Sequence, residues 1–264
     1  MTVAAPARDR DHAPERFDEN YAYYQQTGLA PRFSATWWSA RFYVRVLRRY
    51  VPDGWVLDHG CGMGNVLKVL QERYRAYGLD VSRFAVTAAR ANAPSSRVWV
   101  GDLESLGAAA AGQFTAIVSK HVMEHLADPT SALRTIARVL APGGVLMMGV
   151  PNTKSLLRGL KGDQWIGVKD PTHCSVFPPD YWTAHARDAG LEIIQTFSDG
   201  FWDVPYIPVL HSLIQLPVFG CMAIAQVLVG RPFIPVPLGE SFIMIARKPV
   251  GGGPSQPEAG ARGG

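Results

Sequence analysis

A glycine-rich turn is the first place in the chain where residue types and spacing could do chemistry. Residues 56–65 read VLDHGCGMGN, an apolar run followed by Asp58 and by glycines at positions 60, 62 and 64. Glycines at a strand-to-helix turn let the backbone bend sharply and let a ligand approach where a Cβ would clash. The dinucleotide fingerprint would place its third glycine at position 65, which is Asn65, so an NAD-dependent dehydrogenase fits poorly. A tight turn without a ligand remains the alternative.

Two further carboxylates follow the next apolar runs. Asp80 ends the run 76–79, and Asp102 follows the run 97–100 within Gly101-Asp102-Leu103. A carboxylate at the end of a strand can accept hydrogen bonds from both hydroxyls of a ribose. One on the neighbouring strand can reach an adenine amino group. These positions predict a nucleoside-containing cofactor at one edge of a sheet.

Histidines and a glutamate form the third group of candidates. His121, Glu124 and His125 lie in SKHVMEHL. On a helix the two histidines, four positions apart, would share one face, as metal ligands often do. The alternative is a structural turn, and we expect no metal. His173, in KDPTHCSVF, has an imidazole that can take a proton from an attacking hydroxyl, or it holds its loop in place.

The elements that must position these residues alternate along the middle of the chain. Alternating apolar runs and helical stretches predict a parallel sheet covered by helices on both faces. Ser82 is a plausible N-cap, and residues 141–144 (APGG) should end a helix. We expect strands at 55–57, 76–79, 97–100, 114–119, 145–150, 191–197 and 241–247, and helices at 37–50, 65–71, 83–92, 129–140 and 180–189, with a long loop over 151–177.

An uncharged segment separates the last two expected strands. Residues 204–230 carry no formal charge, but prolines 205, 208 and 217 interrupt them. A membrane-spanning helix needs about 20 predominantly apolar residues. Three interpretations stay open: a buried insertion that lines a pocket or makes an oligomer contact, a peripheral membrane contact, and a spanning helix. We favour the first, a cap over the site.

Taken in order, these motifs resemble one family. The segments VLDHGCGMGN, GLD, GDL, VSKHVMEHLADP and LAPGGVLMMGVPN, from Val56 to about Val150, resemble class I S-adenosylmethionine-dependent methyltransferases of the small-molecule type, with a looser continuation to Lys248. The resemblance implies a Rossmann-like α/β fold with seven strands in the order 3-2-1-4-5-7-6 and helices on both faces. Its seventh strand would be antiparallel, which fits the late run SFIMIAR.

The resemblance also implies a role for each motif. Asp58 would order the glycine loop, and Gly60, Gly62 and Gly64 would face the methionyl part of S-adenosylmethionine. His59 departs from the small or acidic residue typical of its position and should point away from the cofactor. The other implied cofactor-binding residues are Asp80 with Val81 for the ribose, Asp102 with Leu103 for the adenine, and the backbone of Ser119 and Lys120.

On the substrate side the resemblance is less detailed. Similar enzymes often carry a histidine followed four residues later by phenylalanine, as His173 and Phe177 are here, so His173 is the candidate catalytic base. They also close over the acceptor with an aromatic N-terminal lid, although core packing is the alternative for these side chains. The residues implied for the lid and substrate side are Tyr21, Tyr24, Trp37 and His121.

Composition and missing motifs narrow the partners. The 264 residues are 47% hydrophobic and 18% charged, too apolar for a disordered chain. The 26 cations are scattered, without the basic stripe of a nucleic-acid-binding protein. Residues 119–122 read SKHV instead of the Asp/Asn-Pro-Pro-aromatic motif of adenine-N6 and glutamine methyltransferases, and no cysteine follows a proline as in cytosine-C5 enzymes. A small-molecule acceptor is therefore expected, without nucleic acid.

We therefore expect a single methyltransferase domain over residues 16–249, with 16–50 as the N-terminal lid and 198–240 as the hydrophobic insertion, between disordered termini at 1–15 and 250–264. It would transfer a methyl group to a hydrophobic or lipid-like acceptor and release S-adenosylhomocysteine. Isolated cysteines and a polar N-terminus favour a cytoplasmic protein, and arginine in excess of lysine favours bacterial specialised metabolism. The alternatives are a relative that catalyses cyclisation or decarboxylation and a membrane-associated interaction protein.

Overall fold

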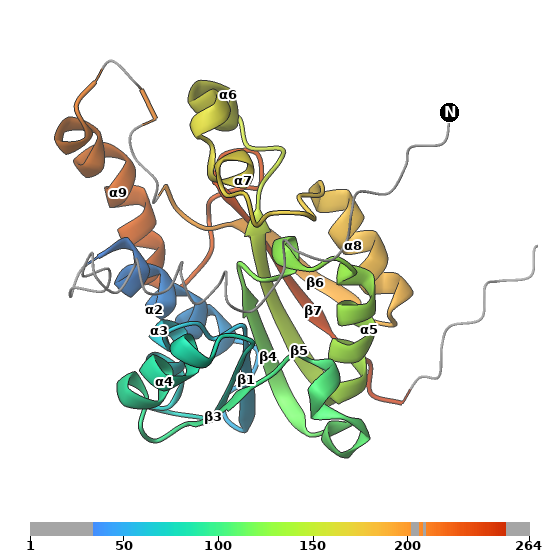
Figure 1. Cartoon of the computed structure of the whole chain (residues 1–264). Helices are drawn as coiled ribbons and strands as arrows, with labels where there is room; N and C mark the ends of the chain where they lie inside the picture. The colour runs from blue at the N-terminus through green and yellow to red at the C-terminus, as the bar shows by residue number, and fades with distance from the viewer. Residues whose placement is uncertain (1–33, 202–205, 208–209, 252–264) are drawn as a thin grey trace, which may run out of the picture.

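One mixed sheet of seven strands forms the centre of the protein (Figure 1). The computed structural model describes residues 34–201, 206–207 and 210–251. The strand order is β3-β2-β1-β4-β5-β7-β6, and only β7 is antiparallel to its neighbours. This confirms the topology implied by the resemblance. The strands are β1 (Trp55–His59), β2 (Arg75–Asp80), β3 (Arg97–Val100), β4 (Phe114–Lys120), β5 (Leu140–Pro151), β6 (Glu192–Ser198) and β7 (Ser241–Arg247).

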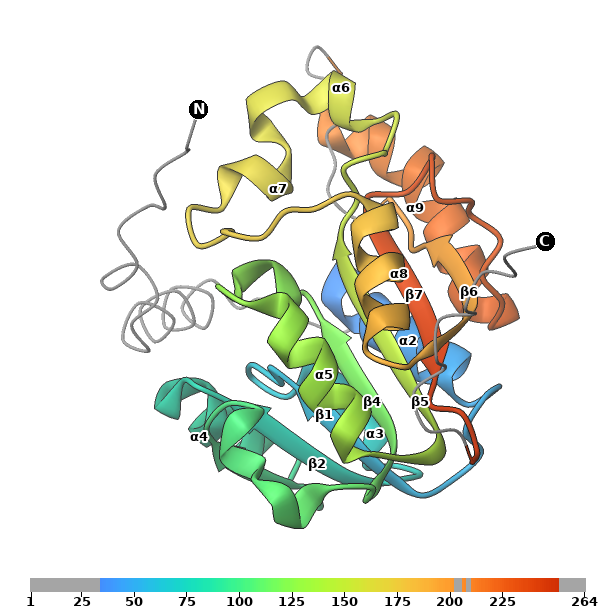
Figure 2. The ribbon, with the colours of Figure 1, turned by 90° about the vertical axis from the view of Figure 1, so that its right-hand side faces the viewer.

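Helices cover both faces of this sheet. Figure 2 looks onto the face covered by α5 and α8, and α2, α3 and α4 lie behind it. Separate buried clusters fill the two layers, one on each face. The helices on one face are α2 (Ala35–Leu47), α3 (Asn65–Leu70), α4 (Arg83–Asn92) and α9 (Ser212–Val229), and those on the other are α5 (Pro129–Val139) and α8 (Pro179–Asp188).

Local sequence signals set most of these boundaries. The Ser82 hydroxyl accepts a hydrogen bond from the amide of Ala85 at 2.9 Å and begins α4. Asp128 caps α5 through the amide of Ser131, with proline at the first helical position. Gly190, with φ of 82°, follows α8 in the left-handed conformation that ends many helices. The sequence analysis placed each of these boundaries within a few residues.

Two expected connections differ from the prediction. Strand β5 begins at Leu140 instead of 145, because Leu140 pairs with Phe114 before the register shifts across the turn 141–144. The expected loop 151–177 contains two single-turn helices, α6 (Arg158–Lys161) and α7 (Ile166–Lys169). Trp165, which is 1% exposed, anchors the loop between them.

The uncharged segment forms α9, which packs beside α2. Arg45 of α2 donates a hydrogen bond to the carbonyl of Val227 at 2.6 Å, so a cation satisfies the C-terminal end of α9. Two buried glutamines of α9 bind the backbone on either side of the helix. Gln215 accepts hydrogen bonds from the amides of Tyr206 and Ile207, and Gln226 accepts them from the amides of Phe233 and Ile234. Within the described ranges, no helix has both the length and the apolar character needed to cross a bilayer.

Candidate active site

The glycine turn joins β1 to α3 in a backbone conformation that favours glycine. Gly60, Gly62 and Gly64 have φ angles of 65°, 50° and 82°, all in the left-handed region. A Cβ on Gly60 would lie 2.2 Å from Cγ2 of Val122, and one on Gly64 would lie 3.0 Å from the Cα of Ala89. Conformation and crowding both exclude side chains at these two positions. The turn therefore presents backbone without intervening side chains at the carboxyl end of β1.

Asp80 holds this turn in place. Its Oδ2 accepts a hydrogen bond from the amide of Gly62 at 2.8 Å, and its Oδ1 accepts one from the amide of Ser82 at 2.9 Å. The side chain is buried at the end of β2, level with the turn. Asp80 thus bonds the turn directly, a role that the sequence analysis did not give it. Because each carboxylate oxygen has a second lone pair, the predicted ribose contact stays compatible with these bonds.

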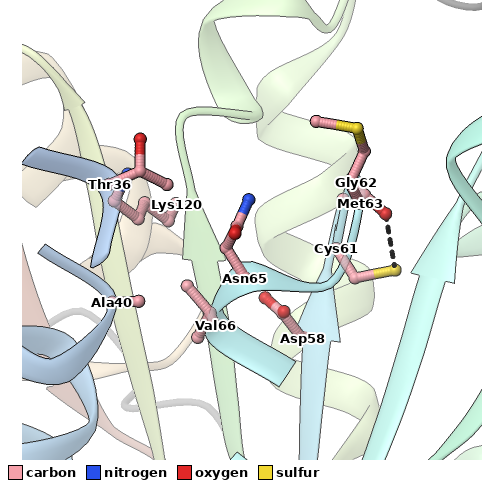
Figure 3. Close-up of a pocket in the computed structure, with 10 residues that line it drawn as sticks. Thr36, Ala40, Asp58, Cys61, Gly62, Met63, Asn65, Val66 and Lys120 are labelled. Carbon is pink, nitrogen blue, oxygen red and sulfur yellow. Dashed lines mark hydrogen bonds between the residues drawn. The ribbon is translucent and has the colours of Figure 1, made fainter. Parts of the chain in front are cut away.

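A pocket of about 320 Å³ opens beside the turn (Figure 3). It lies where β1 and β4 are neighbours, at the point where the strand order reverses. Open α/β sheets bind ligands at the carboxyl ends of their strands at such a point. In Figure 3, Thr36 and Lys120 lie on one side of the pocket and the glycine turn on the other. The lining residues are Thr36, Ala40, Asp58, Gly60, Cys61, Gly62, Met63, Asn65, Val66 and Lys120.

Asp58 is the acidic side chain of this pocket. It is 2% exposed, and its Oδ2 has no hydrogen-bond partner. Burial and the nearby charge of Asp80 raise the pKa of Asp58 to about 8, while Lys120 acts in the opposite direction. A buried carboxylate oxygen without a partner is suited to receive an ammonium group.

Lys120 supplies the cationic side chain of the pocket. Its Nζ lies 5.6 Å from the centroid of the Tyr43 ring. Burial lowers the pKa of Lys120, and the charges of Asp199, Asp58 and Glu124 partly oppose this shift. The sequence analysis used only the backbone of this residue, but its side chain reaches the pocket as well.

His59 and Ser119 join β1 to β4 below the pocket. His59 Nδ1 lies 3.0 Å from the Ser119 hydroxyl, and both side chains are buried. Burial lowers the pKa of His59 to about 4, so the ring is neutral at physiological pH. Neither residue belongs to the set that lines the pocket. The orientation of His59 away from a cofactor stays a prediction.

The interpretation of His121 and His125 as one helical face is wrong. Met123–His125 forms a single 3₁₀ turn, η3, and His121 has φ of 54°, so the two rings point to different partners. His121 Nδ1 lies 3.1 Å from Glu124 Oε1, and His125 Nδ1 lies 2.9 Å from the hydroxyl of Thr172. The turn is thereby bonded to the loop that carries His173.

His173 packs on this turn instead of lining the pocket. Its side chain is 5% exposed, its Nε2 lies 3.8 Å from Asp170 Oδ2, and its ring meets that of His125 edge to face at 4.6 Å. Side-chain atoms of Glu124, His125 and His173 that could coordinate a metal ion lie within 4.8 Å of one another. Hydrogen bonds already engage Glu124 Oε1 and His125 Nδ1, so we interpret this cluster as a structural joint. Phe177 stacks on Tyr181 of α8 at 4.0 Å.

Comparison with known proteins decides the family. The family model described as "Methyltransferase domain" matches residues 37–196, more than half of the chain. The chain belongs to the methyltransferase-domain family. Its strand order is that of the class I S-adenosylmethionine-dependent methyltransferase fold, which solved structures with that description share.

Three proteins illustrate what the chain is similar to. An "Ubiquinone biosynthesis O-methyltransferase" of Pseudomonas paraeruginosa is 30% identical over 149 residues, 52% of this chain and 64% of that protein. A chain from the complex of the Haloferax volcanii Trm112 methyltransferase activator with a methyltransferase superimposes with a TM-score of 0.64, at 20% identity, over 88% of this chain and 97% of that one. The "[4+2]-Cyclase SpnF" superimposes with a TM-score of 0.55, at 25% identity, over 80% of this chain and 81% of that one. The chain spans less than two thirds of the first curated relatives it matches.

The other predicted residues that the structure describes do not belong to the set that lines the pocket. Asp102 is exposed, and its Oδ1 accepts a hydrogen bond from the amide of Ser105 at 2.9 Å. Leu103 is buried in the core, and Val81 is 37% exposed. The guanidinium of Arg41 lies 3.6 Å from the centre of the Trp37 ring on α2. Tyr21, Tyr24, the expected disordered N-terminus 1–15 and all but the first two residues of the expected disordered tail 250–264 lie outside the described residues.

Two buried residues near the pocket were missed. Asp199 is 1% exposed, directly follows β6, and has an Oδ1 without a hydrogen-bond partner. Tyr43 is fully buried on α2, and its hydroxyl also has no partner. The signal that singled out Asp80, an acid at the end of an apolar run, was present at Asp199. Tyr43 gave no such signal, because its position in α2 is equally typical of core packing.

Proposed function

We propose that this protein transfers the methyl group of S-adenosylmethionine to a hydrophobic small-molecule acceptor and releases S-adenosylhomocysteine. The observation that carries the proposal is the pairing of a glycine backbone surface with the unpartnered carboxylate oxygen of Asp58 in one pocket. When bound, the cofactor supplies a methyl group on a positively charged sulfur. Because the methyl carbon is then already activated, the protein has to bind both substrates, orient the acceptor atom toward the methyl group and exclude water.

The side chains of the pocket fit the amino-acid end of this cofactor. Asp58 would hold the ammonium group, and Lys120, on the opposite wall, would attract the carboxylate. The backbone at Gly60 and Gly62 would lie against the methionyl chain. Asp80, Val81, Asp102, Leu103 and the backbone of Ser119 remain the proposed contacts for the nucleoside.

An apolar surface supports a hydrophobic acceptor. On α9, Ile214, Val218 and Met222 are 58%, 66% and 42% exposed and follow one another at the spacing of one helical face. The α6–α7 segment also exposes leucine and valine side chains, and Figures 1 and 2 show it at the same end of the molecule as α9. Contiguous exposed apolar surface of this kind often marks a ligand or membrane contact.

The same surface supports peripheral contact with an anionic membrane. Residues 204–230 carry no formal charge, and exposed cations, Arg158, Lys169 and Arg231, lie in the neighbouring segments. In sedimentation with anionic liposomes, Val218→Glu should weaken binding, whereas Val250→Glu, on an exposed valine after β7, should not. Equal binding by both variants, or no binding by the wild type, would contradict the contact.

The relatives leave two reaction types to compare. The ubiquinone-biosynthesis relative is named as an O-methyltransferase, which supports methyl transfer to oxygen in a small molecule. The likeness to a [4+2]-cyclase supports a cyclisation as the second candidate. The scattered cations and the excess of arginine over lysine favour bacterial specialised metabolism over nucleic-acid modification.

Cofactor titration and product mass together test the proposal. Calorimetry should detect binding of S-adenosylmethionine to the wild type and a large loss of affinity in Gly62→Val. Gly62 lines the pocket and has a left-handed backbone conformation, which valine adopts only with strain. Methyl transfer adds one methyl to the acceptor and yields S-adenosylhomocysteine. A product of unchanged mass would support the cyclase, and wild-type affinity in Gly62→Val would refute the cofactor site.

A further inference from the structure

Three buried polar groups without hydrogen-bond partners lie near Lys120. They are the hydroxyl of Tyr43 on α2, Oε2 of Glu124 in η3 and Oδ1 of Asp199 after β6. Each of these residues is at most 1% exposed. The charges of Asp199 and Glu124 act on both Tyr43 and Lys120, so the four groups are neighbours. Folded proteins rarely leave such groups unpaired, and several at one place indicate that a ligand completes them.

This cluster continues the pocket described above. Lys120 lines that pocket, and Tyr43 follows the lining residue Ala40 by one turn of α2. A Cβ on Gly149 of β5 would lie 1.9 Å from the Tyr43 hydroxyl, so this hydroxyl lies directly against β5. The cluster thus extends from β4 toward β5 and β7, away from the proposed site for the cofactor's amino-acid end at Asp58.

Backbone strain also marks this place. His121 is the one non-glycine residue with positive φ among those the structure describes. Its amide donates to the carbonyl of Gly149 at 2.8 Å, and its ring lies between Glu124 and the hydroxyl of Ser241, 3.3 Å from Nε2. Strain of this kind persists where the surroundings enforce it, most often at functional sites.

We propose that Asp199, with Glu124 and Tyr43, binds the hydrogen-donating group of the methyl acceptor, an alcohol, phenol or amine, and excludes carboxylic acids. This proposal rests on the methyl transfer proposed above. Two carboxylate oxygens without partners accept O–H or N–H donors, whereas an acceptor carboxylate would meet like charge. Lys120 is the one cation of the cluster, and in the proposed site it also faces the carboxylate end of the cofactor.

Asp199 also has the position to take the acceptor's proton. The acceptor's lone pair forms the new bond to the methyl carbon, the carbon–sulfur bond breaks with its electrons going to sulfur, and the O–H or N–H proton passes to Asp199 Oδ1. Burial raises the pKa of Asp199, while His121, Lys120 and Ser241 lower it. A raised pKa makes a carboxylate a better proton acceptor near neutrality.

Binding of three probes with one tail tests the selectivity. The probes are 4-octylphenol, octylamine and octanoic acid, titrated into protein saturated with S-adenosylhomocysteine. The wild type should bind the phenol or the amine at least about tenfold more tightly than the acid, and Asp199→Asn should reduce that ratio by about ten- to a hundredfold. Asp163→Asn, which removes an exposed acid from the α6–α7 segment, should leave the ratio unchanged.

The outcomes separate this inference from the proposed function. If the wild type does not bind S-adenosylhomocysteine, the proposed function fails. If it binds, the inference is overturned when the acid binds as tightly as the phenol and the amine, when none of the three probes binds, or when Asp199→Asn keeps the wild-type ratio. Should Asp199→Asn fail to fold, Asp199→Glu keeps the charge and should keep the order of the three affinities.

Discussion

Substitution of Asp80 tests how the glycine turn is held. In Asp80→Ala the amides of Gly62 and Ser82 both lose a buried, charged acceptor, at 2.8 and 2.9 Å. Hydrogen bonds to charged groups contribute about 1.5–3 kcal/mol each, so the free energy of unfolding should fall by about 3–6 kcal/mol. In a domain of this size each 1 kcal/mol lowers the melting temperature by about 2–4 °C, which predicts a decrease of about 6–24 °C.

Asp102 provides the matched control. It also follows a strand and accepts one amide hydrogen bond, from Ser105, but its side chain is exposed. Loss of such a surface cap costs about 0.5–2 kcal/mol, so Asp102→Ala should lower the melting temperature by a few degrees only. Differential scanning calorimetry measures both variants, and titration with S-adenosylmethionine measures the affinity.

The affinity measurement separates the two roles of Asp80. Loss of the proposed ribose contact removes about another 1.5–3 kcal/mol from cofactor binding, roughly a 10- to 150-fold decrease. A melting temperature for Asp80→Ala within about 3 °C of the Asp102→Ala value would refute the argument that Asp80 holds the turn. Lower stability with unchanged affinity would keep the structural role and remove the ribose contact.

Three further predictions follow from the site. Burial raises the pKa of Asp58 to about 8, so below pH 8 the free protein carries a proton there that the cofactor's ammonium group must displace. The affinity for S-adenosylmethionine should therefore rise from pH 6 to 8, and calorimetry should detect proton release on binding. Asp58→Asn should abolish this pH dependence. Gly64→Ala and Gly112→Ala share a positive φ, but only the Cβ at Gly64 meets a neighbour, so urea unfolding should show about 1 kcal/mol lost at Gly112 and more at Gly64. His173→Ala should lower turnover less than about tenfold if it packs on the turn, whereas a general base requires about 10²–10⁴-fold.

Hydrophobic periodicity and local capping and turn signals in the sequence predicted most of the fold. Apolar runs placed all seven strands, and the Ser82 cap and Gly190 gave helix ends, because these features depend on neighbours in sequence. The glycine turn was equally readable, since its conformation restricts which residues fit. The sequence did not reveal that Asp80 bonds the turn while Asp58 lines the pocket, because this depends on which way two buried carboxylates point.

Long-range pairing explains what was missed near the acceptor. Asp199 lies near His121 only because β7 pairs antiparallel with both β5 and β6, which brings residues 199 and 241 next to His121. Long-range contacts also decide the shape of the segment with His121 and His125, which is the structural turn that the sequence analysis favoured over a helical metal-binding face. Hydrogen bonds from the loop 172–175 hold that segment as a 3₁₀ turn, and no pattern within the segment itself reveals them.

Helix α2 links the two ligand sites thermodynamically. It contributes Thr36 and Ala40 to the cofactor pocket, Tyr43 to the proposed acceptor cluster and, through Arg45, a bond to the end of α9. A ligand that shifts this helix from one site alters the free energy of binding at the other, and linkage makes that effect reciprocal. Binding of one substrate is therefore expected to change the affinity for the other, by the same factor in both directions.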